Sequence, residues 1–350
     1  MTAAEKTVLD RNIKEIRDRA IHFDHVKRLF KSVLLEEPKQ WRSIPNIIET
    51  ITPAALTKLV TISTELLEKH RLFNDKLVII FENQTVDFLK KIQQALDDDF
   101  KQKSISLGFG YQKYEISTLD KEKEPARIFR FIKERNVYSK EEINVEALDQ
   151  TTQSKLSEYD QILGVRSAEI NCYDALIIDH KQSFLILQID LVSLIRSSEL
   201  DKDIEAFIKM LNTILERKFG KGFRIAPKNT AINLYKCIQN FYNKDEGFVT
   251  KLSFTTSKGV HHETLKGAAT DIRKADYHIG GKANESGKIS AYRITKKFEI
   301  DPNNKPQAYI GVRFQYFNKP GNKYLGNARI FDVLSYSSYA FIIKKLLENR

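Results

Sequence analysis

Apolar residues recur every three or four positions through most of the first hundred residues, a spacing that predicts helices with one buried face. Residues 13–34 follow this spacing. Thr52 followed by Pro53 predicts the start of another helix, because threonine can cap a first turn and proline fits its first position. Residues 76–82 predict a buried strand, and residues 85–98 a further helix. The N-terminal part is therefore predicted to be a helix-rich α/β region.

The pattern changes beyond residue 170 to apolar, β-rich runs separated by short polar turns. Such runs predict antiparallel strands joined as hairpins, with side chains alternating between two faces. Helical spacing returns between these runs and at the end of the chain. The whole chain is predicted to be α+β, with antiparallel strands and flanking helices in its C-terminal part. Strands are predicted at residues 173–179, 183–192, 248–256, 260–266, 289–300 and 308–317, and helices at residues 204–219, near 230–241 and at the C-terminal end.

A chain of 350 residues is long for one hydrophobic core, so two packed parts are predicted. Two polar stretches, residues 117–127 and 148–161, are candidates for the boundary. We place the division near residue 150. Residues 1–150 then form the helix-rich α/β region, and residues 151–350 form an α+β region with a basic antiparallel sheet.

Composition is ordinary for a folded globular protein, with 41% hydrophobic and 29% charged residues. Cys172 and Cys237 stand in apolar stretches without CxxC spacing, which argues against a zinc ribbon or a disulfide-stapled secreted domain. The first residues are charged and lack the apolar segment of a secretory signal, and charged residues interrupt the most apolar region. The expected location is the cytoplasm, without membrane contact.

Charge is distributed unevenly along the chain. The net charge is +11, and residues 251–350 contain 18 Lys and Arg against 8 Asp and Glu. Nearly all of the excess is therefore C-terminal. A foldable basic region attracts phosphate-rich or acidic partners through long-range electrostatic steering. The alternative interpretation is a soluble protein that is simply rich in lysine.

The segment 258–288 is a Gly-containing, basic connection between predicted strands. Neither a P-loop nor a GxGxxG motif is present, so no named phosphate-binding motif applies. A mobile basic connection can still follow a sugar-phosphate backbone, and a solvated hairpin extension is the competing interpretation. The residues predicted to bind nucleic acid here are Lys258, Lys266, Arg273, Lys274, Lys282 and Lys288.

The two strands predicted after this segment extend the basic surface. Strand alternation places Arg293 and Lys297 on one face, and we predict that Arg313 and Gln315 share a surface with them beside Tyr309. Interleaved basic and aromatic residues on a sheet suit single-stranded nucleic acid, where bases stack and phosphates pair with cations. Tyrosines on sheets also serve as half-buried packing residues, and this alternative stays open.

Histidines in the same region offer a metal alternative. His261 and Glu263 lie two positions apart in a predicted strand and share a face, and His278 lies far enough along the chain to fold back. None of the helical HExxH or zinc-finger spacings is present, so exposed histidines on a hairpin are the favoured interpretation. We therefore predict no metal site and no cofactor from these residues.

An enzymatic alternative comes from the hairpin of residues 173–192. Asp174, Gln188 and Asp190 are predicted to share one sheet face on neighbouring strands. This layout is similar to that of the PD-(D/E)xK nucleases, whose acids on adjacent strands hold magnesium. The resemblance implies Asp174, Gln188 and Asp190 as catalytic residues and Mg²⁺ as the only expected cofactor. The second strand reads Gln188-Ile189-Asp190, with no lysine where that motif has one.

The sequence favours a nucleic-acid-binding protein that contacts the phosphate backbone through a basic C-terminal sheet and loop. Host defence or genome maintenance in a prokaryote would suit such an activity. The alternatives are a metal-dependent nuclease and a protein-interaction subunit that docks an acidic partner or a second copy of itself. Whether the chain catalyses any reaction stays open.

Overall fold

The computed structural model describes residues 3–33, 37–104, 106–119, 126–143, 145–159, 162–192, 197–267, 270–284, 289–301 and 304–350. The described part contains eleven α-helices and one eleven-stranded antiparallel sheet. The predicted α+β class and the helix-rich first hundred residues are confirmed, while the strands are spread along the chain. Among the described residues, no helix has both the length and the apolar character needed to cross a membrane.

Helices with a capping residue in the sequence begin or end near their predicted positions. The Thr85 hydroxyl accepts a hydrogen bond from the backbone N–H of Phe88, and Gly220 follows the longest helix with a φ of +90°. The helices are α1 (Ala3–Asp18), α2 (Phe23–Lys31), α3 (Ile44–Thr50), α4 (Pro53–Phe73), α5 (Val86–Lys101), α6 (Gln150–Leu156), α7 (Ser197–Phe219), α8 (Tyr235–Asn243), α9 (Asp276–Asn284), α10 (Phe314–Phe317) and α11 (Tyr336–Glu348).

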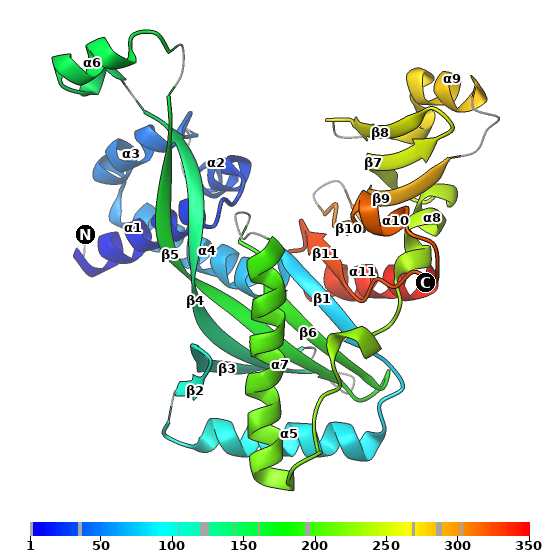
Figure 1. Cartoon of the computed structure of the whole chain (residues 1–350). Helices are drawn as coiled ribbons and strands as arrows, with labels where there is room; N and C mark the ends of the chain where they lie inside the picture. Colours follow the sequence, from blue (N-terminus) through cyan, green and yellow to red (C-terminus); the bar gives the residue numbers. More distant parts are fainter. Residues whose placement is uncertain are drawn as a thin grey trace. The chain divides into compact units, whose positions relative to one another are not determined.

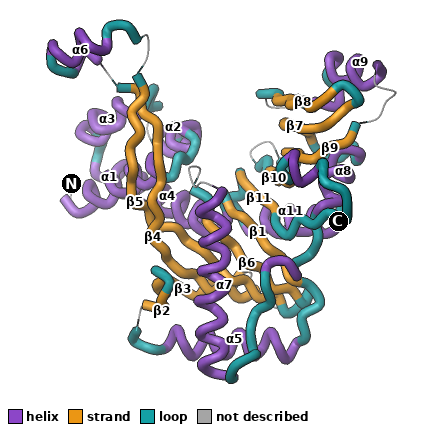
Figure 2. Tube along the Cα trace, viewed as in Figure 1, coloured by secondary structure: helices purple, strands orange, loops and turns teal. Residues whose placement is uncertain are grey.

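The strands are β1 (Lys76–Phe81), β2 (Ser106–Gly108), β3 (Tyr111–Leu119), β4 (Ala126–Glu142), β5 (Leu163–Asp179), β6 (Phe184–Asp190), β7 (Phe248–Thr256), β8 (Gly259–Thr264), β9 (Ser290–Lys297), β10 (Gln307–Gly311) and β11 (Ala328–Phe331). Their order in the sheet is β2-β3-β4-β5-β6-β1-β11-β10-β9-β7-β8 (Figure 2). The predicted buried strand, β1, lies in the middle between β6 and β11, and all six of its residues are buried. It therefore joins strands that lie far apart in the sequence.

The chain forms two compact units, each assembled from several segments. The first unit contains Met1–Thr64, Lys133–Cys172 and Leu191–Asp203, and the second contains Glu65–Ile132, Tyr173–Asp190 and Ile204–Arg350. Residue 150, the predicted boundary, lies inside a segment of the first unit, so the two compact units differ from the predicted parts. The division near residue 150 stays a prediction about which parts of the chain fold separately. Residues 120–125 of one candidate boundary and residues 160–161 of the other lie outside the described residues.

The first unit has a helical core. Leu9 and Ile16 of α1 and Val26 and Phe30 of α2 are fully buried. The buried Asn12 amide donates to the Ser63 hydroxyl of α4 at 3.0 Å, which satisfies a polar group inside this core. The helical spacing of the N-terminal residues thus serves a helix-on-helix core.

The second unit contains the C-terminal strands, and α8 and α11 lie against one face of them (Figure 1). The apolar core beneath these helices includes Ile294 and Ile310 from the strands and Phe241 and Ile342 from the helices. Burial of one sheet face fixes which side chains point to the other face, because strand side chains alternate. That other face carries the candidate site.

The prediction of one strand across residues 308–317 is wrong in its second half. Strand β10 ends at Gly311, and residues 314–317 form the short helix α10. The ring centroids of Phe314 and Phe317 lie 5.8 and 5.3 Å from that of Tyr292, so the turn brings both rings onto one buried aromatic side chain. Packing against a residue distant in sequence overrides the local alternation here.

Candidate nucleic-acid interface

Strand pairing builds a continuous face across the C-terminal part of the sheet. Arg293 of β9 lies opposite Ser253 of β7 and Gly311 of β10. Residues directly opposite one another in an antiparallel pair point to the same side. The next row along the strands contains Lys251, Thr295, Tyr309 and Arg329, from β7, β9, β10 and β11.

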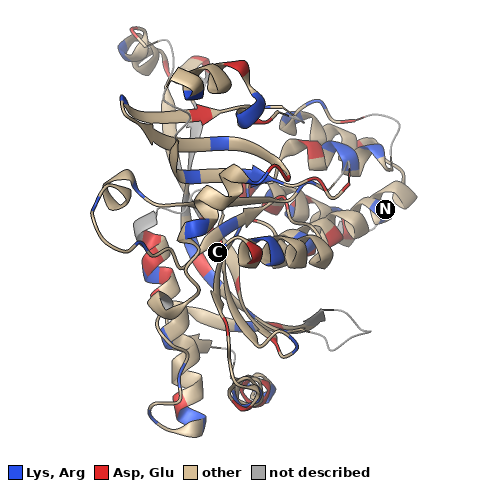
Figure 3. Ribbon diagram, turned by 90° about the vertical axis from the view of Figure 1, so that its right-hand side faces the viewer, with Lys and Arg blue, Asp and Glu red and all other residues tan. Residues whose placement is uncertain are grey.

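Four basic residues from three strands therefore share this side, and we call Lys251, Arg293, Lys297 and Arg329, together with Tyr309 of β10, the basic face. Lys251 is exposed and the other three cations are half-buried. No Asp or Glu occupies the described, paired positions of these rows. In Figure 3, Lys and Arg positions recur along the strands of this region. The potential over the basic face is therefore positive.

Tyr309 is the aromatic member of the basic face. It is half-buried, and the guanidinium carbon of Arg329 lies 5.8 Å from its ring centroid. This is the geometry of a cation–π contact. Thr295, its opposite neighbour on β9, is small and buried. The tyrosine ring and the guanidinium thus lie side by side on adjacent strands.

Gly311 lets the Arg293 side chain lie across strand β10. A Cβ atom at Gly311 would lie 2.5 Å from Cγ of Arg293 and 3.0 Å from its Cα. Arg293 Nε donates to the Val312 carbonyl at 2.9 Å, which fixes one edge of the guanidinium. The glycine therefore allows the close approach that positions this cation.

The residues of the segment 258–288 that were predicted to bind nucleic acid differ in their exposure and in their contacts. Lys258 and Lys266 are exposed. The Lys274 side chain is 66% exposed and its ammonium lies 3.6 Å from the carboxylate of the exposed Asp245. The Lys282 ammonium lies 5.2 Å from the Tyr242 ring centroid. Lys288 lies outside the described residues.

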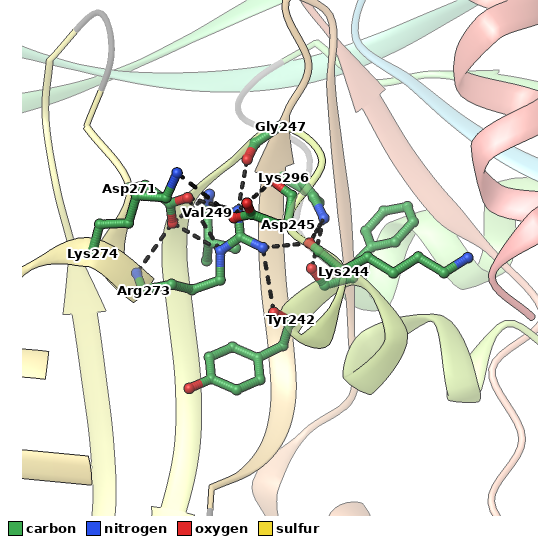
Figure 4. Close-up of polar contacts among 10 residues, drawn as sticks. Tyr242, Lys244, Asp245, Gly247, Val249, Asp271, Arg273, Lys274 and Lys296 are labelled. Carbon is green, nitrogen blue, oxygen red and sulfur yellow. Dashed lines mark hydrogen bonds and ion pairs between the residues drawn. The ribbon is translucent and has the colours of Figure 1, made fainter. Parts of the chain in front are cut away.

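Arg273 is held inside the protein (Figure 4). Its Nε and Nη2 donate to the Asp271 carboxylate at 3.0 and 2.6 Å, and only 11% of its side chain is exposed. Burial works to raise the pKa of the Asp271 carboxyl, but hydrogen bonds and charge from Arg273 outweigh it and hold the pKa below its usual value. The remaining donors reach the backbone carbonyls of Tyr242, Lys244, Asp245 and Gly247.

Lys296 binds the same stretch of backbone from the other side. It points to the buried face of β9, and its ammonium donates to the carbonyls of Phe241 and Lys244 at 2.8 and 2.7 Å. Burial, together with the charge of Arg273, lowers the pKa of Lys296 to about 8. Both cations satisfy carbonyl groups at and just beyond the C-terminus of α8, where a helix leaves acceptors without partners and carries partial negative charge. The geometry favours a structural role for Arg273 in place of the predicted phosphate contact.

Arg313 and Gln315 do not join the rows of the basic face. Arg313 is exposed and precedes α10 at its N-cap position, while Gln315 lies within that helix. The expectation that both share a strand face with Tyr309 is wrong, because β10 ends before them. Arg313 stays a prediction as a peripheral contact.

The predicted catalytic residues are fully buried in the centre of the sheet. Asp190 lies 2.8 Å from the ammonium of Lys76 on β1, and both side chains are 0% exposed. Asp174 accepts hydrogen bonds from the Tyr111 hydroxyl at 2.7 Å and from the backbone N–H of Asp190 at 2.8 Å. These contacts are those of a hydrogen-bonded core network.

The expectation that Asp174 and Gln188 share a face is wrong. Ala175 lies opposite Gln188, so Asp174, one residue earlier on β5, points to the other side. Among the described residues, no three His, Cys, Asp or Glu side chains form a group that could hold a metal ion. Catalysis by Asp174, Gln188 and Asp190 stays a prediction without support from this geometry.

Two of the three residues of the metal alternative, Glu263 and His278, form a hydrogen-bonded pair, while His261 lies apart from them. His278 is buried, and its Nδ1 lies 2.8 Å from the Glu263 carboxylate and its Nε2 3.0 Å from the Tyr242 hydroxyl. His261 instead stacks on Phe254 with ring centroids 5.0 Å apart. His278 therefore connects α9 to the edge strand β8 and to α8, and His261 packs β8 against β7.

Lys251 and Arg329 are members of the basic face that sequence reasoning missed. Lys251 stands in a correctly predicted strand, and its being the one charged residue of that strand was a usable signal. Arg329 stands in β11, a strand of four residues that is too short to show a periodic pattern. No protein-family model matches this chain, and no curated protein matches it.

Proposed function

We propose that this protein binds nucleic acid, mainly through phosphate contacts made by the basic face. The observation that supports the proposal is the convergence of four cations from three strands of one sheet, β7, β9 and β11, on one side, with no acid at the described positions between them. Lysine and arginine on a nucleic-acid-binding surface pair with phosphates and release condensed counterions.

The apolar core behind the sheet gives these cations fixed positions. Strand neighbours lie about 4.8 Å apart, so the row from Lys251 to Arg329 spans about 14 Å. A phosphate backbone crossing the strands meets several cations along its path. Contacts of this kind position the nucleic acid without reading its sequence.

Four lysines of the segment 258–288, three of them exposed and Lys282 half-buried, extend the surface. Lys258, Lys266, Lys274 and Lys282 would add phosphate contacts that depend less on a fixed geometry, because they stand in turns and on the short helix α9. We expect their individual contributions to be smaller than those of the basic face, since exposed, mobile side chains lose entropy when they bind.

The decisive variant replaces Lys251, Lys297 and Arg329 by alanine in the full chain. A matched control replaces Lys90, Lys209 and Lys236, three exposed lysines on α5, α7 and α8, so both variants lose three charges. Binding of labelled DNA and RNA is measured by fluorescence anisotropy over a range of salt concentrations. We expect the first variant to bind more weakly than the control and its log-log salt slope to be shallower by about 2 to 3. Equal losses in the two variants would mean that only net charge matters.

The nuclease alternative uses the same samples. It requires the buried network around Asp174 and Asp190 to open toward solvent and Mg²⁺, because both carboxylates are 0% exposed. Magnesium-dependent cleavage that is lost in Asp190→Asn, in a variant that still folds and binds, would favour a nuclease. A binding activity without cleavage supports the proposal, and host defence or genome maintenance would use such an activity.

A further inference from the structure

The width of the sheet restricts which nucleic acid the basic face can take. Five neighbouring strands, β8, β7, β9, β10 and β11, lie side by side, which corresponds to about 19 Å between the outer two. The major groove of B-DNA is about 12 Å wide and admits a helix or a two-stranded ribbon. A sheet side of this width therefore does not fit inside a duplex groove, whereas a single strand can lie across it.

The centre of the basic face offers a stacking surface. Tyr309 stands in the row between Thr295 and Arg329, and its ring is paired with the Arg329 guanidinium at 5.8 Å. Bases of a single strand are free to stack on aromatic rings and on guanidinium planes, while paired bases are already stacked inside the duplex. The same neighbourhood supplies cations for the flanking phosphates from Lys251, Arg293 and Lys297.

We infer that the basic face binds single-stranded nucleic acid, with a base stacked on Tyr309 beside Arg329. This inference rests on the proposed function and adds the class of nucleic acid and the residue that distinguishes it. Lys251, Arg293 and Lys297 hold the backbone, and the Tyr309–Arg329 pair holds a base. Sequence preference is weak in this arrangement, because every base presents a π-face.

The test compares labelled single strands and duplexes of equal length, as DNA and as RNA, on the full-length wild-type protein. We expect single strands to bind about tenfold or more tighter than duplexes at the same salt concentration. Tyr309→Ala should weaken single-strand binding about fivefold or more and change duplex binding less than about twofold. Tyr309→Phe keeps the ring and should bind as the wild type does.

The matched control is Tyr277→Ala, which removes a tyrosine of α9 that is 86% exposed and is not a member of the basic face. It should leave binding unchanged. Trp41 is the single tryptophan of the chain, so Tyr309→Trp in a Trp41→Phe background places one indole on the basic face. Quenching of its fluorescence by single strands but not by duplexes supports stacking.

The outcomes separate the two levels of the proposal. Duplexes that bind as tightly as single strands in the wild type overturn the inference and leave nucleic-acid binding intact. A Tyr309→Ala variant that folds and keeps its single-strand affinity also overturns it. Absence of binding to every nucleic acid overturns the proposed function itself. The wild-type comparison decides the question even if Tyr309→Ala does not fold.

Discussion

The neighbours of each basic residue determine whether its charge can contact a phosphate or is used inside the fold. Arg273 and Arg293 have the same side chain, yet Arg273 is enclosed by a carboxylate and backbone carbonyls while Arg293 lies half-buried across strand β10 on the basic face. The difference comes from their neighbours. Gly311 opens the space that Arg293 occupies, and Asp271 supplies the partner that retains Arg273.

Gly311→Ala tests the position of Arg293 without changing any charge. The added Cβ would lie 2.5 Å from Cγ of Arg293, so the side chain must move and loses its present alignment. We expect nucleic-acid affinity to fall about three- to tenfold, the scale of one weakened charge-assisted hydrogen bond. Gly280→Ala on α9 is the matched control, because nothing lies within 4 Å of its Cβ position. Anisotropy titrations that give the same affinity for both variants would contradict this role of Gly311.

Elements far apart in sequence are joined by a few buried polar contacts. The C-terminus of α8 is held by Arg273 from the turn before α9 and by Lys296 from β9. Carbonyl groups at a helix end need donors, and both cations also complement the partial negative charge there. The connection between α8 and β7 is thereby fixed against the sheet.

Arg273→Ala should destabilise the fold by about 3 to 5 kcal/mol, because it leaves the buried Asp271 carboxylate without its partner. Lys274→Ala, on the same turn and largely exposed, should change stability by less than about 0.5 kcal/mol. Urea unfolding at neutral pH measures both. Similar stability of the two variants would show that the buried pair contributes little.

The same pair predicts a pH dependence of defined sign. The pKa of Asp271 is lowered in the folded protein from its ordinary 3.8, so its contribution is fully present above that value and is lost as pH falls through the lower folded pKa. The difference in stability between wild type and Arg273→Ala should therefore shrink at about pH 3 relative to pH 7. A constant difference would contradict the ion pair as its cause.

At the scale of the whole molecule, the excess of positive charge in the C-terminal residues and the arrangement of the basic face predict different binding preferences. The C-terminal hundred residues hold most of the net charge of +11, which alone would attract any polyanion. The basic face adds a spacing and an aromatic residue that suit nucleic acid. The two contributions can be separated by competition.

Poly-glutamate at matched charge concentration should displace labelled single-stranded nucleic acid at least about tenfold less effectively than unlabelled nucleic acid does, because a carboxylate chain offers no base to stack. Anisotropy competition with the full-length protein measures this ratio. Equal displacement by both polymers would favour the alternative of an acidic protein partner.

The sequence by itself determined the local features of this protein. Helical spacing located α5, Thr52 before Pro53 located the start of α4, and the apolar run 76–82 located β1. Alternation in β9 correctly separated Arg293 and Lys297 from the buried Ile294. These features depend on neighbours within a few positions along the chain. Local periodicity and capping chemistry therefore suffice to predict them.

Only the tertiary structure decided which side chains meet. Pairing of β7 with β9 and of β10 with β11 added Lys251 and Arg329 to the basic face, and aromatic packing on Tyr292 removed Arg313 from it. The enclosure of Arg273 depends on carbonyl groups about thirty residues earlier in the chain. Such contacts depend on the order of the strands in the sheet and on which polar groups are buried. The hydrophobic periodicity of the sequence predicts one helix or strand at a time and contains no information about either.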